Sequence, residues 1–155
     1  MSMSEIAGIR QTILSEALDW LGTPYRHQGS RKGVGCDCLG LVLGIWREVY
    51  GSEPEHPGAY AADWAETGGG DRLLDAARRH CVERDVEEMQ PGDLLVFRWR
   101  PQHAAKHVGI LLRGDCFLHA YEGHAVLISP LIAQWRRKIA GVFAFPDITN
   151  AALRG

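Results

Sequence analysis

The stretch that decides the fold runs from Gly35 to Trp46 and reads Gly-Cys-Asp-Cys-Leu-Gly-Leu-Val-Leu-Gly-Ile-Trp. Its apolar residues recur at helical spacing and continue to Val49, which predicts a buried helix from about Cys38 to Tyr50. Asp37 is a good N-cap residue, because its carboxylate can accept from the free N–H groups of the first turn. Cys38 would then hold the first helical position, where the helix dipole favours a thiolate over a thiol. The stretch therefore predicts a cysteine nucleophile held on a rigid element.

Length and composition indicate one soluble domain. The chain has 155 residues, of which 46% are hydrophobic and 23% are charged, which is ordinary for a globular protein. Its net charge of −2 argues against a nucleic-acid partner, which would favour a basic surface. The N-terminus has no basic segment followed by an apolar run, and no apolar run reaches membrane-spanning length. We therefore expect synthesis in the cytoplasm without a signal peptide, and no membrane insertion.

The four cysteines are Cys36, Cys38, Cys81 and Cys116. A chain made in a reducing cytosol favours free thiols over disulfides. Structural zinc is the competing interpretation, but its usual signature of paired C-x-x-C knuckles is missing. Cys36 precedes the helix and lacks the benefit of its dipole, so we take it as a bystander.

Segments on either side of this stretch follow simple local signals. An apolar 3.6-residue period predicts a helix from about Ser4 to Leu21, ended by Gly22 and Pro24. Residues 23–35 are polar and rich in glycine, which predicts a surface loop that leads to Cys38. Residues 52–70 indicate irregular structure, with a short helical turn near 60–64. Asp71 is expected to cap a further helix that ends near His80.

After Pro91 the pattern changes to apolar runs of strand length separated by turns. Five strands are predicted, at residues 94–97, 106–112, 116–121, 125–128 and 139–145. A short helix or turn is expected at 130–135. Helices followed by an antiparallel sheet indicate an α+β domain, with the Cys38 helix packed across the sheet. We expect one domain over residues 1–146 and a loose tail at 147–155.

The predicted hairpin around Gly114 brings two of the seven histidines together. Its register places Gly109 opposite His119, and His107 lies two residues from Gly109 on the same face. His107 and His119 are thus diagonal neighbours, which suits a base and the residue that orients it. We assign His107 as the base and His119 as the third member, although register alone also permits the reverse. Gly109 would leave room for the helix terminus that carries Cys38.

Any one histidine on a sheet is more often structural than catalytic, but two on one face beside a helix-capping cysteine favour catalysis. The N–H of Cys38 is a candidate oxyanion donor, and the Tyr25 hydroxyl could be a second. His103 and His107 have the spacing of a metal-binding helix, but no glutamate follows His103 and the segment leads into a strand. We therefore predict no metal site.

Five motifs in order resemble those of the NlpC-like cell-wall cysteine peptidases. They are Leu21-Gly-Thr-Pro-Tyr-Arg-His-Gln-Gly29, Asp37-Cys-Leu-Gly-Leu41, Pro91-Gly-Asp-Leu94, His107-Val-Gly-Ile110 and Phe117-Leu-His-Ala120. The resemblance implies a papain-like α+β fold, with N-terminal helices packed on about five antiparallel strands. It also implies that Cys38 is the nucleophile, His107 the base and His119 the third polar residue, with Tyr25 beside the cysteine and Asp37 and Leu39 supporting the oxyanion loop.

Members of this family typically cleave the amide between γ-D-glutamate and meso-diaminopimelate in peptidoglycan stem peptides, without a metal or cofactor. Two departures touch the substrate groove: Leu39 stands where serine is most common, and His27-Gln28 replace an aromatic-glycine pair. The Asp-Cys-Leu-Gly variant and the expected lack of a signal peptide resemble the phage-tail subgroup, which also occurs in gene transfer agents. That resemblance implies tail-tip or baseplate hub partners and a virion-like tail that acts in the periplasm and cell wall.

Three rival functions stay open from the sequence. Two are same-fold enzymes: a muramoyl-alanine amidase and a lipid-directed thiol acyltransferase. The third is a structural tail or baseplate protein without turnover, although it would not need Cys38, His107 and His119 together.

Overall fold

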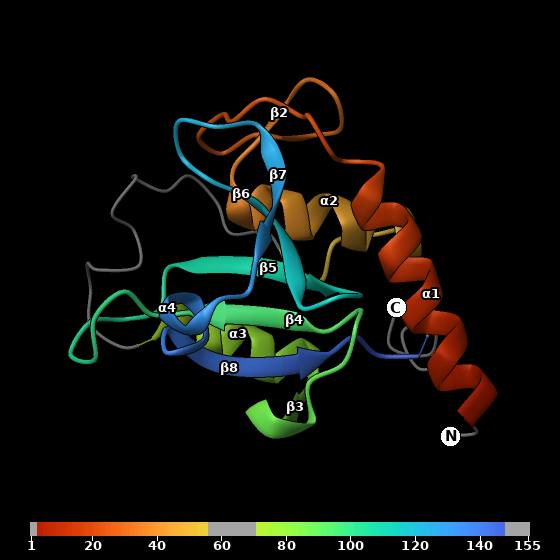
Figure 1. Cartoon of the computed structure of the whole chain (residues 1–155). Coiled ribbons are helices and arrows are strands. Elements are labelled where there is room, and N and C mark those ends of the chain that lie inside the picture. The colour runs from red at the N-terminus through yellow and green to blue at the C-terminus, as the bar shows by residue number, and fades with distance from the viewer. Residues whose placement is uncertain (1–2, 56–70, 148–155) are drawn as a thin grey trace.

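A computed structural model of the chain describes residues 3–55 and 71–147 (Figure 1). The helices are α1 (Met3–Leu18), α2 (Cys38–Tyr50), α3 (Arg72–His80), α4 (Ala133–Arg136) and the 3-10 turn η1 (Val86–Glu88). The strands are β1 (Ser30–Arg31), β2 (Gly35–Cys36), β3 (Val82–Arg84), β4 (Leu94–Phe97), β5 (His107–Leu112), β6 (Cys116–Ala120), β7 (Val126–Pro130) and β8 (Ile139–Ala144). The predicted α+β class is confirmed. The predicted turn near 60–64 and the tail beyond Asp147 lie outside the described residues.

The main sheet has six strands in the order β3-β8-β4-β5-β6-β7, and every neighbouring pair is antiparallel. The five strands predicted from the sequence are all present, so the expected count was one too low. The missed strand, β3, is a three-residue edge strand whose Val82 and Glu83 are exposed. A short, polar edge strand has no alternating apolar pattern to reveal it. A separate two-stranded hairpin, β1–β2, lies in the loop before α2.

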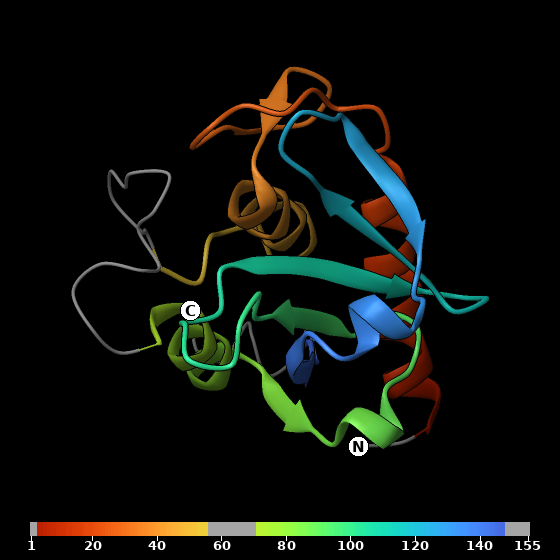
Figure 2. The same ribbon diagram turned by 60° about the vertical axis from the view of Figure 1, so that its left-hand side comes forward.

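Side chains alternate across the sheet and form two cores. On one face Val96, Ile110 and Leu118 pack in the larger core with residues of α1 and α2. On the other face Phe97 and Phe117 belong to a smaller core. Figures 1 and 2 show α2 and α4 on different sides of β5. The predicted packing of the Cys38 helix against the sheet is confirmed, and the histidines of β5 and β6 fall on the face away from it.

Helix α1 is shorter than the sequence predicts. It ends at Leu18, and both Leu18 and Leu21 are 45% exposed, although the periodicity placed them on the buried face. Trp20 is buried instead, and its ring lies against Gly44 of α2. The contact is so close that a Cβ added at Gly44 would lie 2.2 Å from the ring. In this segment the large indole is buried and the two leucines are not, although the spacing of the leucines predicted the opposite.

Both predicted caps stand at their positions, but only one acts as expected. Asp37 caps α2, whose bounds match the prediction, and Gly51 ends the helix in the left-handed conformation with a φ of 86°. Asp71 precedes α3 without a side-chain capping bond. Its carboxylate instead accepts from the Ala105 N–H at 3.3 Å and pairs with Arg98 at 3.0 Å. Asp71 therefore connects the start of α3 to the loop before β5.

Candidate active site

The loop before α2 is tied to the helix by the buried carboxylate of Asp37. Its Oδ1 accepts from the Gly40 N–H at 2.8 Å, and its Oδ2 accepts from the Gln28 N–H at 2.7 Å. The Asp37 N–H in turn donates to the carbonyl of Gly29 at 3.2 Å. One carboxylate thus holds both the first turn of α2 and the preceding loop, which fixes the position of Cys38.

Gly40 lets this loop cross the first turn of the helix. A Cβ at Gly40 would lie 1.7 Å from the carbonyl oxygen of Gly29, a distance that no side chain can accept. Ser30 adds a hydrogen bond from its hydroxyl to the carbonyl of Gly40 at 2.7 Å. The glycine after Leu39 is therefore required by the close approach of two backbone segments.

Cys38 is partly buried, and its thiol donates to the carbonyl of Lys106 at 3.7 Å. Burial raises its pKa to about 12, although backbone hydrogen bonds from Val108 and Leu39 oppose the shift. The helix dipole was expected to favour a thiolate, but the resting form of Cys38 is the thiol. Loss of water around the sulfur raises the pKa by more than the dipole lowers it. The thiol must lose its proton during the attack itself, which makes a nearby base necessary.

His107 and His119 form the predicted pair. Nε2 of His107 lies 2.8 Å from Nδ1 of His119, and the two side chains are almost completely buried. The β5–β6 pairing of Ile110 with Leu118 is the predicted register, and it continues to Gly109 opposite His119.

The expected role of Gly109 was wrong. A Cβ at Gly109 would lie 3.0 Å from the Phe117 ring and 3.3 Å from Cβ of His119. The missing side chain of Gly109 therefore makes room for residues of β6 and not for α2. Cys38 reaches β5 from the opposite side of the sheet, at the carbonyl immediately before His107. The thiol therefore contacts the residue that precedes His107 at the start of β5.

Ser129 of β7 is a third member of the histidine chain that the sequence reading missed. Its hydroxyl lies 2.8 Å from Nε2 of His119, so both nitrogens of His119 are engaged. The two histidines have four ring nitrogens, and three of them have a hydrogen-bond partner. The fourth, Nδ1 of His107, has no such partner among the described residues. This hydrogen-bond pattern leaves an open ring nitrogen on His107 and none on His119, which suits the predicted role of His107 as base. The β6–β7 pairing is centred on Gly123 and places Phe117 opposite Ser129. The position of this turn in the sequence could therefore have predicted that Ser129 lies near His119.

Both histidines rest in the neutral form. Burial and the neighbouring His119 lower the pKa of His107 to about 3, and burial with His124 lowers that of His119 to about 4. A neutral imidazole with a vacant Nδ1 can accept the proton of a neutral thiol. The residues are thus suited to general-base attack from an uncharged pair.

Tyr25 lies beside the start of α2, as predicted. Its backbone bridges to Cys36, and the flanking Arg26 N–H donates to the Cys36 carbonyl at 3.0 Å. Burial, followed by the neighbouring Cys38, raises the pKa of Tyr25 to about 12. Its hydroxyl is therefore a neutral donor near the sulfur, in keeping with an oxyanion role. Leu39 is partly buried and packs against the same core.

Aromatic rings surround the histidine pair. Trp99 stacks on His107 with ring centroids 5.3 Å apart and planes at 25°, and Trp135 of α4 lies 5.9 Å from the same ring. Phe117 lies 4.3 Å from His119. Phe117 shares a face of β6 with His119, but Trp99 and Trp135 come from a loop and a helix outside the hairpin, where no strand period could place them. They exclude water from the histidines and explain why both pKa values fall.

The other candidate residues do not join this site. All four cysteines are free, and Cys36 is completely buried in the larger core, with burial raising its pKa to about 12. His103 lies in an exposed turn. Among residues 3–55 and 71–147, no group of three His, Cys, Asp or Glu could hold a metal ion.

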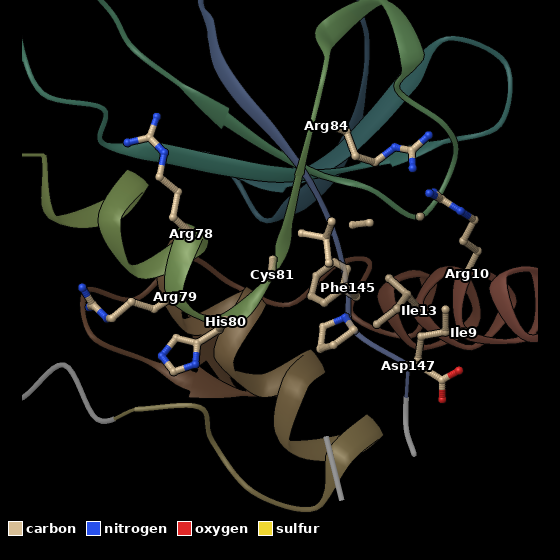
Figure 3. A pocket seen from close by; sticks show the side chains of 14 residues that line it. Ile9, Arg10, Ile13, Arg78, Arg79, His80, Cys81, Arg84, Phe145 and Asp147 are labelled. Carbon is tan, nitrogen blue, oxygen red and sulfur yellow. The ribbon is translucent and has the colours of Figure 1, made fainter. Parts of the chain in front are cut away.

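A cavity of about 290 Å³ lies away from these residues, between α1, α3 and the end of β8 (Figure 3). Its apolar lining includes Ile9, Ile13 and Phe145, and its arginines are engaged by acidic side chains: Arg10 by Asp93, Arg78 by Glu83 and Arg79 by Glu55. The cavity therefore holds no part of the cysteine–histidine site. No helix in the described part of the chain is long and apolar enough to cross a membrane.

The NlpC/P60 family model matches residues 22–143 of this chain. The chain belongs to the NlpC/P60 family. This NlpC/P60 chain is 30% identical over 131 residues to the probable endopeptidase NlpC of Escherichia coli strain K12, which covers 84% of the chain and 71% of the relative. It also resembles the crystallised NlpC/p60 domain of the peptidoglycan hydrolase SagA, at 26% identity and a TM-score of 0.57 over 88% of this chain and 97% of that one.

Two further relatives are longer than the NlpC/P60 chain. The gamma-DL-glutamyl hydrolase of Bacillus subtilis strain 168 is 26% identical over 138 residues, which are 88% of this chain and 30% of that protein. Tail tip assembly protein K of Escherichia phage N15 is 29% identical over 122 residues, which are 76% of this chain and 49% of that protein. The chain therefore matches one part of each of these proteins.

Proposed function

We propose that this protein is a cysteine peptidase that hydrolyses amide bonds in peptidoglycan stem peptides. The observation that carries the proposal is the hydrogen-bonded chain from His107 through His119 to Ser129, with the thiol of Cys38 at the carbonyl of Lys106, the residue before His107. A fixed nucleophile and an oriented neutral base are the parts that acyl transfer requires. The names of the endopeptidase and hydrolase relatives support the substrate class.

The proposed reaction has two steps. Nδ1 of His107 takes the proton of the Cys38 thiol as the sulfur attacks the scissile carbonyl carbon. The resulting oxyanion accepts from the Cys38 N–H and the Tyr25 hydroxyl, and the imidazolium then gives its proton to the leaving amine. Water, deprotonated by the same imidazole, hydrolyses the thioester and releases the acid with Cys38 restored.

The bond that we propose is the γ-D-glutamyl–meso-diaminopimelate amide. The resemblance of the five sequence motifs supports it, as does the name of the Bacillus relative, a gamma-DL-glutamyl hydrolase. A muramoyl-alanine amidase and a lipid-directed thiol acyltransferase use the same residues on another bond. Mass spectrometry of the products from purified sacculi separates them, since each enzyme leaves a different new terminus.

We further propose that the peptidase acts as a component of a phage-like tail or gene transfer agent particle, bound to hub proteins of the tail tip or baseplate. The support is the similarity to the tail tip assembly protein of phage N15. The particle would then bring the enzyme to the cell wall. A structural tail protein without turnover is the alternative from a different class.

Substitution of the nucleophile tests the proposal. Cys38→Ala is expected to abolish release of muropeptides from sacculi while the thermal unfolding transition is retained. Cys116→Ala is its matched control, because Cys116 lies by the β5–β6 turn, at the other end of β5 from His107. Unchanged release by folded Cys38→Ala protein would contradict the peptidase function. A wild-type protein that releases nothing and resists thiol-directed inhibitors would favour the structural alternative.

A further inference from the structure

Lys138 carries a positive charge at the edge of the aromatic cluster around the histidines. Its Nζ lies 5.5 Å from the ring centroid of Trp99 and 5.7 Å from that of Trp135. Both indoles also contact the imidazole of His107, at 5.3 Å and 5.9 Å between centroids. The ammonium group is thus joined to the base through two shared aromatic neighbours.

The backbone of Lys138 is fixed on both sides. Its N–H donates to the carbonyl of Trp135 at 2.9 Å, and its carbonyl accepts from the Arg98 N–H at 2.7 Å. Lys138 therefore bridges α4 and the loop after β4, so the start of its side chain is positioned before any ligand binds.

The indole rings stabilise the charge but offer it no hydrogen-bond acceptor. An ammonium group has three N–H donors, and an indole offers a π face and an N–H donor but no acceptor. Among the described residues, no acidic side chain lies within ion-pair distance of Lys138. Asp71, which pairs with the residue that donates to the Lys138 carbonyl, is engaged by Arg98 at 3.0 Å. A carboxylate from outside the protein could therefore bind Lys138 without displacing a protein partner.

From this arrangement we propose that Lys138 is a specificity-determining residue that binds a carboxylate of the substrate on the acyl side of the scissile bond. The inference rests on the proposed function. A γ-glutamyl linkage uses the side-chain carboxyl of glutamate, so the α-carboxylate of the same residue stays free and negatively charged. Lys138 gives the site a charged contact for that group, connected to the base through the rings of Trp99 and Trp135.

A pair of synthetic stem peptides tests the assignment. One carries γ-D-glutamate with a free α-carboxylate, and the other carries the α-carboxamide. The wild-type protein is expected to show a kcat/KM that is roughly 10- to 100-fold higher for the carboxylate peptide, the range for a charge-assisted hydrogen bond. Lys138→Met, which keeps an unbranched apolar stem, should lose this preference by slowing only the carboxylate reaction. Lys138→Arg should restore part of it.

Arg137→Met is the matched control, because it removes one positive charge from the adjacent exposed residue. An equal loss of preference in Arg137→Met would show a general charge effect and overturn the assignment, as would retention of the preference in Lys138→Met.

Equilibrium binding separates this inference from the proposed function. In a Cys38→Ala background, titration calorimetry should give tighter binding of the carboxylate peptide, and Lys138→Met should remove the difference. Failure of the wild-type protein to cleave either peptide would reject the proposed function, whereas equal binding of the two peptides by Cys38→Ala would reject the role of Lys138.

Discussion

His107 and His119 share one hydrogen bond, 2.8 Å long, between Nε2 of the first ring and Nδ1 of the second. Because Ser129 engages the other nitrogen of His119, the chain has one open end, at Nδ1 of His107. If Ser129 accepts from His119, then His119 accepts from His107 and Nδ1 of His107 carries a lone pair. The strand register thus supplies both a base and the groups that set its tautomer.

Removal of the Ser129 hydroxyl should weaken this tautomer preference. Ser129→Ala is expected to lower kcat about five- to tenfold with little change in KM, since one hydrogen bond that orients the base is lost. The measurement is steady-state kinetics together with 15N chemical shifts of the His107 ring, which report the protonated nitrogen. Ser15→Ala, on the exposed side of α1, is the control. An unchanged kcat and unchanged ring shifts would show that Ser129 does not position the pair.

Acid should destabilise the fold through the same two histidines. Their pKa values in the folded chain, about 3 for His107 and about 4 for His119, lie below the ordinary value of 6.5. The unfolded chain therefore binds more protons between about pH 4 and 6.5, so the free energy of unfolding falls as the pH falls through this window. The slope is at most about 1.4 kcal/mol per pH unit for each histidine, and it vanishes above the ordinary pKa.

Denaturant unfolding at a series of pH values measures this slope. The variant His119→Phe removes one of the two titrating groups and should show a shallower decline, whereas His103→Gln, in an exposed turn, should follow the wild type. A decline of equal steepness in His119→Phe would mean that other groups control acid unfolding.

Gly40 should be intolerant of even one added methyl group. Gly40→Ala would place a Cβ 1.7 Å from the Gly29 carbonyl oxygen, and the loop or the helix must move to relieve the clash. We expect a loss of roughly 1–3 kcal/mol in the free energy of unfolding, with reduced kcat in the folded protein because Cys38 lies two residues away. Gly8→Ala in α1 meets nothing within 4 Å and should gain about 0.5–1 kcal/mol. Equal stabilities of the two variants would show that the crossing of loop and helix is not tight.

Tyr25 is expected to act through its hydroxyl alone. Its pKa of about 12 keeps the group protonated at every pH where the enzyme is assayed, so it can donate to an oxyanion throughout. Tyr25→Phe should lower kcat roughly 100-fold, the effect of losing one oxyanion donor, and should leave the unfolding temperature nearly unchanged. A change confined to KM would place the hydroxyl on the bound substrate and not on the oxyanion.

Local sequence patterns correctly predicted several helices and strands and one side-chain pairing. The bounds of α2 followed from helical spacing and from Asp37, and the pairing of His107 with His119 followed from the turn centred on Gly114. The same patterns failed where another segment decided the outcome. Leu18 is exposed whereas Trp20 is buried against α2, and Asp71 binds Ala105 and not its own helix.

By itself, the sequence determined which residues lie on one helix turn and which share one strand face. These relations depend on backbone periods of 3.6 and 2, which any short segment carries within it. The tertiary structure alone decided how much water reaches those residues. Trp99 and Trp135 cover the histidine pair from a loop and a helix outside the strands that carry it, and burial keeps Cys38 a thiol despite its place at a helix start. Desolvation depends on every neighbour at once, so the protonation states of this site appear only after the chain has folded.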